Sequence, residues 1–181
     1  MGGQLAGREG YRQPAYGGRT YKGCRQQAAD LQFEMKRIRL PEDIYFLRYQ
    51  PCIITICTKD KYKYFSEGSF TFVCIDVLIE LSSKNNIRLF AYCFMPEHIH
   101  LVISVDGNKS IIDFVRKFKS VSTIKSRAFG LHARIYQSRF HDHFIRKEEG
   151  LNKTILYVLN NPVRKGMVEK WEDYPYSGFF K

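Results

Sequence analysis

Two histidines, His98 and His100, occupy alternate positions of an apolar stretch that ends at Val105. Side chains of a β-strand point to opposite faces in turn, so both imidazoles share one face while Ile99 and Leu101 share the other. Two imidazoles on one face can bind a single metal ion, with a third ligand from elsewhere in the chain. The spacing alone favours two half-exposed polar residues on a sheet face over a metal site. The presence of two imidazoles in an otherwise apolar strand favours the metal site.

The histidines belong to a predicted β-hairpin that runs from Leu89 to Val105. Two apolar runs of strand length flank Met95-Pro96-Glu97. Proline lacks the amide proton that a central strand donates to its neighbour, so Pro96 marks the turn. The second run would place its alternate apolar side chains in a core and turn both histidines away from that core.

A second pair of residues, Tyr157 and Asn161, lies at positions i and i+4 and shares a helix face if the helix reaches Asn161. Pro162 disfavours the helical conformation of the residue before it and can itself begin a new helix. Asn161 is then the N-cap of that helix. Capping and metal ligation compete for this side chain, and spacing alone favours the cap.

The elements that must position these residues follow from apolar periodicity and turn signals. They are a strand within residues 49–58, an amphipathic helix over 70–83 that the pair Asn85-Asn86 ends, and the hairpin. A helix capped by Ser110 follows, and its predicted buried stripe includes Ile111, Ile112, Val115, Phe118, Val121 and Ile124. A fourth strand over 134–140 and a last helix over about 150–160 complete the set. This order predicts an α+β fold, the ferredoxin-like split β-α-β with an antiparallel sheet and an extra C-terminal helix.

The composition favours a polyanion as the partner. The chain of 181 residues carries a formal charge of +11 and 15% aromatic residues. Between Lys109 and Arg134, seven basic residues face a single acidic residue, Asp113. A solvated helix face on a basic protein is the alternative interpretation. The cations predicted to contact a DNA backbone are Arg116, Lys117, Lys119, Lys125 and Arg127.

The chain is predicted to consist of an arm and one domain. Residues 1–32 hold seven of the 13 glycines among spaced tyrosines and arginines, so a disordered arm is expected there. Residues 33–181 are long enough to form one domain with its own core. Membrane association is not expected, because no apolar run has the length of a membrane span and the first residues lack a signal-peptide core.

The five cysteines are odd in number and scattered, without a Cys-x-x-Cys pair. This usage argues against a zinc ribbon or a disulfide scaffold and fits a reducing compartment. A cytoplasmic location is therefore expected.

Together these motifs resemble the single-tyrosine HUH transposases, above all the REP-associated tyrosine transposases of bacteria. The resemblance rests on the His-Ile-His sequence at 98–100 after Met95-Pro96, and on Tyr157 followed by Asn161-Pro-Val-Arg164. It covers residues 38–177. Supporting sequences lie at 140–146 and 172–177.

The resemblance implies that His98 and His100 bind a divalent metal, that Tyr157 on the C-terminal helix is the nucleophile and that Asn161 occupies the position of the third metal ligand. It implies cleavage of single-stranded DNA through a 5′-phosphotyrosine intermediate, at hairpin-forming ends and in a bacterial cytoplasm. Mixed nitrogen and oxygen ligation suits Mg²⁺ or Mn²⁺. A homodimer is compatible with the sequence.

Two functions of other classes are compatible with the same residues. One is a regulator that binds single-stranded nucleic acid without cleaving it. The other is a metal hydrolase in which His141 and His143, on either side of Asp142, join His98 and His100. The alternative for the second histidine pair is a polar surface loop. A covalent adduct with DNA distinguishes these functions from a transposase.

Overall fold

The computed structural model of the protein describes residues 49–66, 68–105, 110–146 and 149–180. The predicted arm, residues 1–32, lies outside the described residues. In the part of the chain that the structure describes, no helix is both long enough and apolar enough to cross a membrane.

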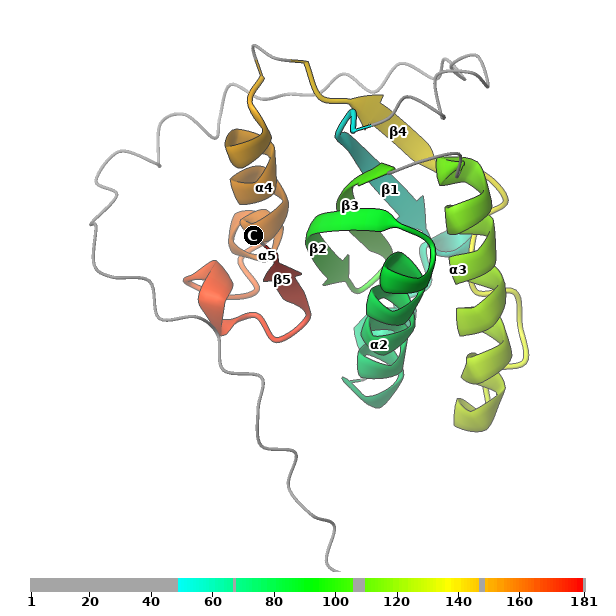
Figure 1. Cartoon of the computed structure of the whole chain (residues 1–181). Coiled ribbons are helices and arrows are strands. Elements are labelled where there is room, and N and C mark those ends of the chain that lie inside the picture. The colour runs from blue at the N-terminus through cyan, green and yellow to red at the C-terminus, as the bar shows by residue number, and fades with distance from the viewer. Residues whose placement is uncertain (1–48, 67, 106–109, 147–148, 181) are drawn as a thin grey trace, which may run out of the picture. The chain divides into compact units, whose positions relative to one another are not determined.

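A five-stranded antiparallel sheet forms the centre of the described domain (Figure 1). Its strands are β1 (Cys52–Cys57), β2 (Ile87–Met95), β3 (His98–Val105), β4 (His141–Phe144) and β5 (Ser177–Phe179), in the spatial order β4-β1-β3-β2-β5. The hairpin strand β3 lies between β1 and β2, which are joined by a helix. This arrangement confirms the predicted ferredoxin-like split β-α-β, to which β5 adds an edge strand that was not predicted.

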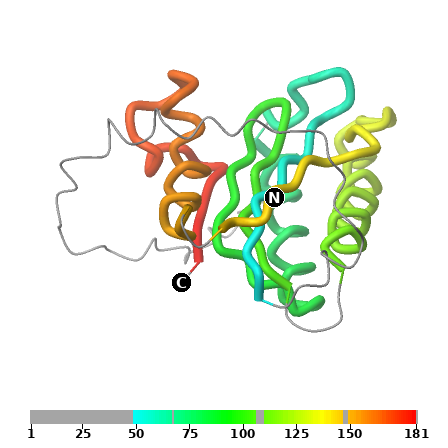
Figure 2. The backbone as a smooth tube through the Cα atoms, turned by 90° about the horizontal axis from the view of Figure 1, so that it is seen from above, coloured from blue at the N-terminus to red at the C-terminus, as the bar shows by residue number. Residues whose placement is uncertain are grey.

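Helices cover both faces of the sheet. The helices α2 (Gly68–Lys84) and α3 (Ile111–Ser126) cover one face, and α4 (Leu151–Leu159), followed by the short α5 (Asn161–Arg164), covers the other (Figures 1 and 2). Within the described ranges, four 3-10 turns connect these elements: η2 (Lys59–Lys61), η3 (Tyr64–Ser66), η4 (Arg127–Phe129) and η5 (Trp171–Asp173).

The first core lies between the sheet and helices α2 and α3. From β3 it receives the predicted alternate residues, and each of them is fully buried. These residues are Ile99, Leu101, Ile103 and Val105. Among the described residues, 23 buried side chains join this core, so it supplies most of the apolar burial that stabilises the fold.

The second core lies on the opposite face of the sheet, under α4. Its eight buried side chains are Ile53, Ala91, Cys93, Met95, Val102, Ile145, Val158 and Tyr174. This second core, which buries Val102 of β3, was not predicted. The two histidines of β3 therefore lie beside a second, smaller apolar layer.

The predicted ends of the two long helices are confirmed. Asn85 follows the last residue of α2 and its side chain donates to the Leu81 carbonyl at 2.6 Å, while Asn86 turns the chain at a positive φ of 53°. The Ser110 hydroxyl caps α3 by accepting from the Ile112 amide at 3.1 Å. Both ends use the local chemistry that the sequence indicated.

The predicted buried stripe of α3 is wrong at its end. Ile124 is 60% exposed. The buried stripe instead passes from Phe118 through Ser122 to Ser126, whose spacing of four residues keeps one helix face toward the core. Ile124 lies on the opposite side of that helix turn.

The fourth strand was predicted over residues 134–140 but forms at His141–Phe144. Within the predicted range only Tyr136 makes a bridge, to the residue after β1. The reason is a contact from α3: the Lys119 ammonium donates to the three backbone carbonyls of residues 137–139, at 3.0, 3.4 and 3.1 Å. Three successive carbonyls directed at one side chain cannot also form a strand ladder.

Candidate active site

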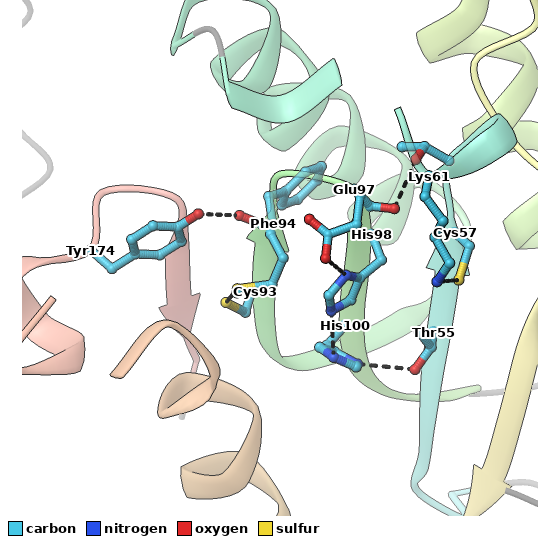
Figure 3. A network of polar contacts seen from close by, with 11 residues as sticks. Thr55, Cys57, Lys61, Cys93, Phe94, Glu97, His98, His100 and Tyr174 are labelled. Carbon is cyan, nitrogen blue, oxygen red and sulfur yellow. Dashed lines mark hydrogen bonds and ion pairs between the residues drawn. The ribbon is translucent and has the colours of Figure 1, made fainter. Parts of the chain in front are cut away.

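His98 and His100 project from β3 toward the face that α4 covers. Their Nε2 atoms lie 3.1 Å apart, and their rings meet edge to face at 83° with centroids 4.7 Å apart (Figure 3). Strand alternation thus brings the two predicted imidazoles together with their Nε2 atoms directed at one point.

This geometry fits two ligands of one metal ion. Imidazole nitrogens bind divalent metals at about 2.1 Å, so two such ligands at right angles lie about 3.0 Å apart. The observed separation of 3.1 Å matches that value.

The outward nitrogens of both rings have their own partners. Nδ1 of His98 lies 3.3 Å from a carboxylate oxygen of Glu97, and Nδ1 of His100 lies 3.0 Å from the Thr55 hydroxyl (Figure 3). Such partners fix the orientation of a metal-binding imidazole. The Glu97 carboxylate can only accept, so it favours the proton on Nδ1 of His98 and leaves Nε2 available, whereas the Thr55 hydroxyl can donate or accept and orients the His100 ring without selecting its tautomer. Sequence analysis missed Glu97 and Thr55. Only the position of Glu97 in the turn beside His98 hinted at its contact.

The surroundings of both imidazoles favour the neutral form, because they lower the pKa of each ring. Burial, together with smaller contributions from His98 and the Arg164 charge, lowers the pKa of His100 to about 3. Burial also lowers the pKa of His98, and the Lys61 charge acts in the same direction while Glu97 opposes both. Neutral imidazole is the form that binds a metal.

Tyr157 lies in α4, half-buried against the second core. The guanidinium carbon of Arg164 lies over its ring, 4.7 Å from the ring centre. The charge of Arg164 also lowers the pKa of His100, so this guanidinium lies near both the tyrosine and the histidine pair. Sequence analysis assigned no role to Arg164, because no local spacing indicates where an exposed guanidinium points.

Asn161 is buried and begins α5. Its Nδ2 donates to the carbonyls of Tyr157 and Val158, at 3.1 and 3.2 Å, and so caps the end of α4 rather than the start of the next helix. The predicted N-cap is therefore wrong. A carbonyl can only accept, so the amide nitrogen must face α4 and Oδ1 must point elsewhere. Capping and oxygen donation thus use different atoms and do not compete.

The second histidine pair lies in β4 and not in a surface loop. His143 Nε2 contacts both carboxylate oxygens of Glu149, at 3.1 and 2.9 Å. His141 lies opposite Thr55 in the strand register. Throughout the described ranges, no group of three or more His, Cys, Asp or Glu side chains is placed to hold a metal ion. The four histidines of the predicted metal hydrolase are therefore not brought together.

The predicted DNA-binding cations lie on α3 and η4, across the sheet from the histidines. Arg116 pairs with Asp113 at 2.6 Å, and Lys119 is held by the carbonyls of residues 137–139. Lys117, Lys125 and Arg127 are exposed. The structure does not bring this group together with His98, His100 and Tyr157.

Comparison with known proteins gives a family match. The model of the family described as "Transposase IS200 like" matches residues 48–155, more than half of the chain. The match includes both histidines of β3 and ends two residues before Tyr157.

Two curated proteins are similar to the chain. A protein of Haemophilus influenzae, provisionally named a REP-associated tyrosine transposase, is 33% identical over 102 residues, which cover 50% of this chain and 58% of that protein. The REP-associated tyrosine transposase of Escherichia coli K12 is 27% identical over 104 residues, which cover 58% and 61%. The chain thus spans about three fifths of the length of these relatives.

One solved structure supports the fold. The structure of a REP-associated tyrosine transposase bound to a REP hairpin superposes with a TM-score of 0.64 at 22% identity. The superposition covers 79% of this chain and 82% of that chain.

Proposed function

Because this chain belongs to the family of IS200-like transposases, we propose that it cleaves and rejoins single-stranded DNA, with Tyr157 as the nucleophile, in a domain formed by residues 33–181. The observation that carries this proposal is the pair of Nε2 atoms 3.1 Å apart on the sheet face that α4 covers. The helix that bears Tyr157 packs on that same face.

His98, His100 and Asn161 form the proposed metal site. Two imidazole nitrogens and one amide oxygen are a donor set for a divalent cation such as Mg²⁺ or Mn²⁺, and they leave positions open for phosphate and water. When bound, such a cation polarises a phosphate oxygen and stabilises the charge that develops as the phosphorus is attacked. Glu97 and Thr55 hold the two rings in the ligating orientation.

In the cleavage step, one bond to phosphorus forms and another breaks. The Tyr157 hydroxyl loses its proton to solvent as its oxygen forms a bond to the phosphorus, and the bond from phosphorus to the 3′ oxygen breaks. The departing 3′ oxygen takes up a proton and becomes a 3′-hydroxyl, while the 5′ side remains as a phosphotyrosine. Attack by the same or another 3′-hydroxyl reverses the step and rejoins strands without ATP.

Arg164 is the proposed partner of the phosphate. None of the described residues accepts a hydrogen bond from its guanidinium, which is exposed above the Tyr157 ring. Its N–H groups can therefore bind phosphate oxygens in a charge-assisted manner, beside the oxygen that attacks.

The proposed substrate is a DNA end that forms a hairpin, as in the similar protein that was solved with a REP hairpin. Exposed cations of α3 and η4 are the proposed contacts for the DNA backbone, at a distance from the chemistry. They are Arg116, Lys117, Lys125 and Arg127. Lys119 was predicted with them, but its contacts with three carbonyls leave it less available.

A covalent adduct tests this proposal. The protein is incubated with a labelled single-stranded oligonucleotide and Mg²⁺ or Mn²⁺, and adducts are separated on a denaturing gel. Tyr157→Phe removes one oxygen, so it should abolish the adduct and leave DNA binding within a few fold. Tyr176→Phe, at another half-buried tyrosine, is the control and should keep the yield.

Two results contradict the proposal. One is an undiminished adduct from Tyr157→Phe, and the other is full cleavage by the wild type in excess EDTA. Mixing Tyr157→Phe with His100→Ala additionally tests a homodimer, because the adduct returns only if two chains share an active site.

A further inference from the structure

Beyond the metal and tyrosine site, the exposed surface contains a loop in which lysines alternate with tyrosines. This Tyr62 loop comprises residues 59–64, with Lys59, Lys61 and Lys63 all exposed. Tyr62 is 63% exposed, and its ring lies 4.6 Å from that of Tyr64 at an angle of 50°. Exposed aromatic rings among cations are a combination that surfaces binding single-stranded nucleic acid use.

The residues that flank the loop are both hydrogen-bonded to the turn that precedes His98. The Thr58 amide and hydroxyl both donate to the Glu97 carbonyl, at 3.0 and 2.8 Å. At the other end the Phe65 amide donates to the Pro96 carbonyl at 3.1 Å. Figure 3 shows Lys61 beside the turn that carries Glu97 and His98. The Tyr62 loop is therefore fixed next to the metal site.

The backbone of the loop is strained. Asp60 and Lys61 have φ values of 53° and 57°, which place two consecutive residues with side chains in the left-handed region. Lys59 pairs with Asp60 at 2.6 Å, and the Lys61 ammonium contacts the Cys57 sulfur at 3.7 Å. Strain that is held in place by such contacts is often found where a protein binds a ligand.

We propose that the Tyr62 loop is a stacking subsite for an unpaired base of the single-stranded DNA, next to the phosphate that is cleaved. This inference rests on the proposed function, because it assumes that a single strand passes the histidine pair. Every base presents a flat face that an exposed tyrosine can stack on, and the neighbouring lysines match the charge of the backbone on both sides of that base. A paired base in a duplex offers no such face.

Binding to natural and abasic DNA tests the subsite. Two labelled oligonucleotides share the same length and phosphate backbone, and one lacks bases in its single-stranded part. In fluorescence anisotropy, Tyr62→Ala should weaken binding of the natural oligonucleotide roughly 5- to 100-fold and leave binding of the abasic one unchanged. Tyr62→Phe keeps the ring and should bind both like the wild type.

Phe72→Ala provides a matched control. Phe72 is an aromatic side chain of α2 that is 48% exposed, on the helix that covers the other face of the sheet. Its loss should not change the ratio of the two affinities. A second variant, Lys63→Gln, should make the slope of log affinity against log salt shallower by about 0.7 if Lys63 contacts one phosphate.

Three results overturn the subsite. They are an unchanged affinity of Tyr62→Ala for natural DNA, an equal loss on both oligonucleotides, and an equal change in Phe72→Ala. If the wild type forms the adduct and Tyr62→Ala binds natural DNA with unchanged affinity, the subsite is contradicted and the proposed function stands. No adduct from the wild type, together with base-dependent binding through Tyr62, contradicts the proposed function and supports the loop as a single-strand site.

Discussion

The two faces of the sheet differ in what they bury. The face under α2 and α3 buries 23 described apolar or aromatic residues, whereas the face under α4 buries eight and also holds both imidazoles of β3. A single strand supplies both faces, because Ile99 and Leu101 alternate with His98 and His100. If the proposed site is correct, the alternation lets one strand contribute to stability and to chemistry through adjacent residues. Substitutions on one face should then lower stability, and substitutions on the other face should lower activity.

The largest expected difference is between alanine substitutions of His100 and Leu101. His100→Ala should abolish adduct formation and change the free energy of unfolding by about 1 kcal/mol. Leu101→Ala, one residue along, leaves a cavity in the first core and should cost about 2–5 kcal/mol in stability while the folded fraction stays active. Urea unfolding and the adduct gel measure the two effects. The comparison fails if both variants lose stability equally.

The next effect concerns Arg164 on the chemical face. Arg164→Ala should slow cleavage at saturating DNA by about 100-fold, because it removes donors from the developing charge. DNA affinity should change only a few fold. Lys170→Ala is the control, since it removes an exposed positive charge of the same C-terminal segment. An equal rate loss in both variants would indicate a general charge effect.

A smaller effect is expected on the face of α3. Arg116→Ala with Lys117→Ala should make the slope of log affinity against log salt shallower by roughly 1.4, or 0.7 for each phosphate contact on a single strand. The preferred DNA sequence should not change. Salt titration by fluorescence anisotropy measures this slope. An unchanged slope means that the backbone does not follow α3.

The last effect is a pH dependence of stability at Lys119. Burial, with the nearby charge of Arg134, lowers its pKa from an ordinary 10.5 to about 8. Between these values the folded protein binds fewer protons than the unfolded chain, so this group makes the protein more stable as pH rises from about 8 to 10.5. Urea unfolding across that range should show a steeper rise for the wild type than for Lys119→Met. Parallel curves would contradict the lowered pKa.

Local patterns predicted most of the fold. The period of two in β3, the proline turn, the Ser110 cap and the asparagines after α2 all depend on neighbours in sequence, and each is confirmed. The predicted position of the fourth strand was wrong because Lys119, on another element, donates hydrogen bonds to the carbonyls of residues 137–139. A side chain that approaches from about 20 residues away leaves no periodic signal in the segment that it displaces.

The candidate site, like the fold, was predictable only where its geometry depends on residues within one element. Strand alternation brought His98 and His100 together, because both lie on one element. The position of Arg164 over Tyr157 and the direction of the Asn161 amide depend on how α4 meets α5, which spacing does not encode. The roles of Tyr157 and Asn161 stay predictions that the adduct assay decides.

The small size of the second core has a consequence for how the protein opens. Cooperative units with little buried apolar surface open at lower free energy than the whole molecule unfolds. The α4 layer, which meets the sheet through that core, is such a unit. Amide hydrogens of α4 should therefore exchange with solvent through openings that leave α2 closed. The tyrosine and the histidines would separate in those openings, so the proposed active site would be lost before the sheet itself unfolds.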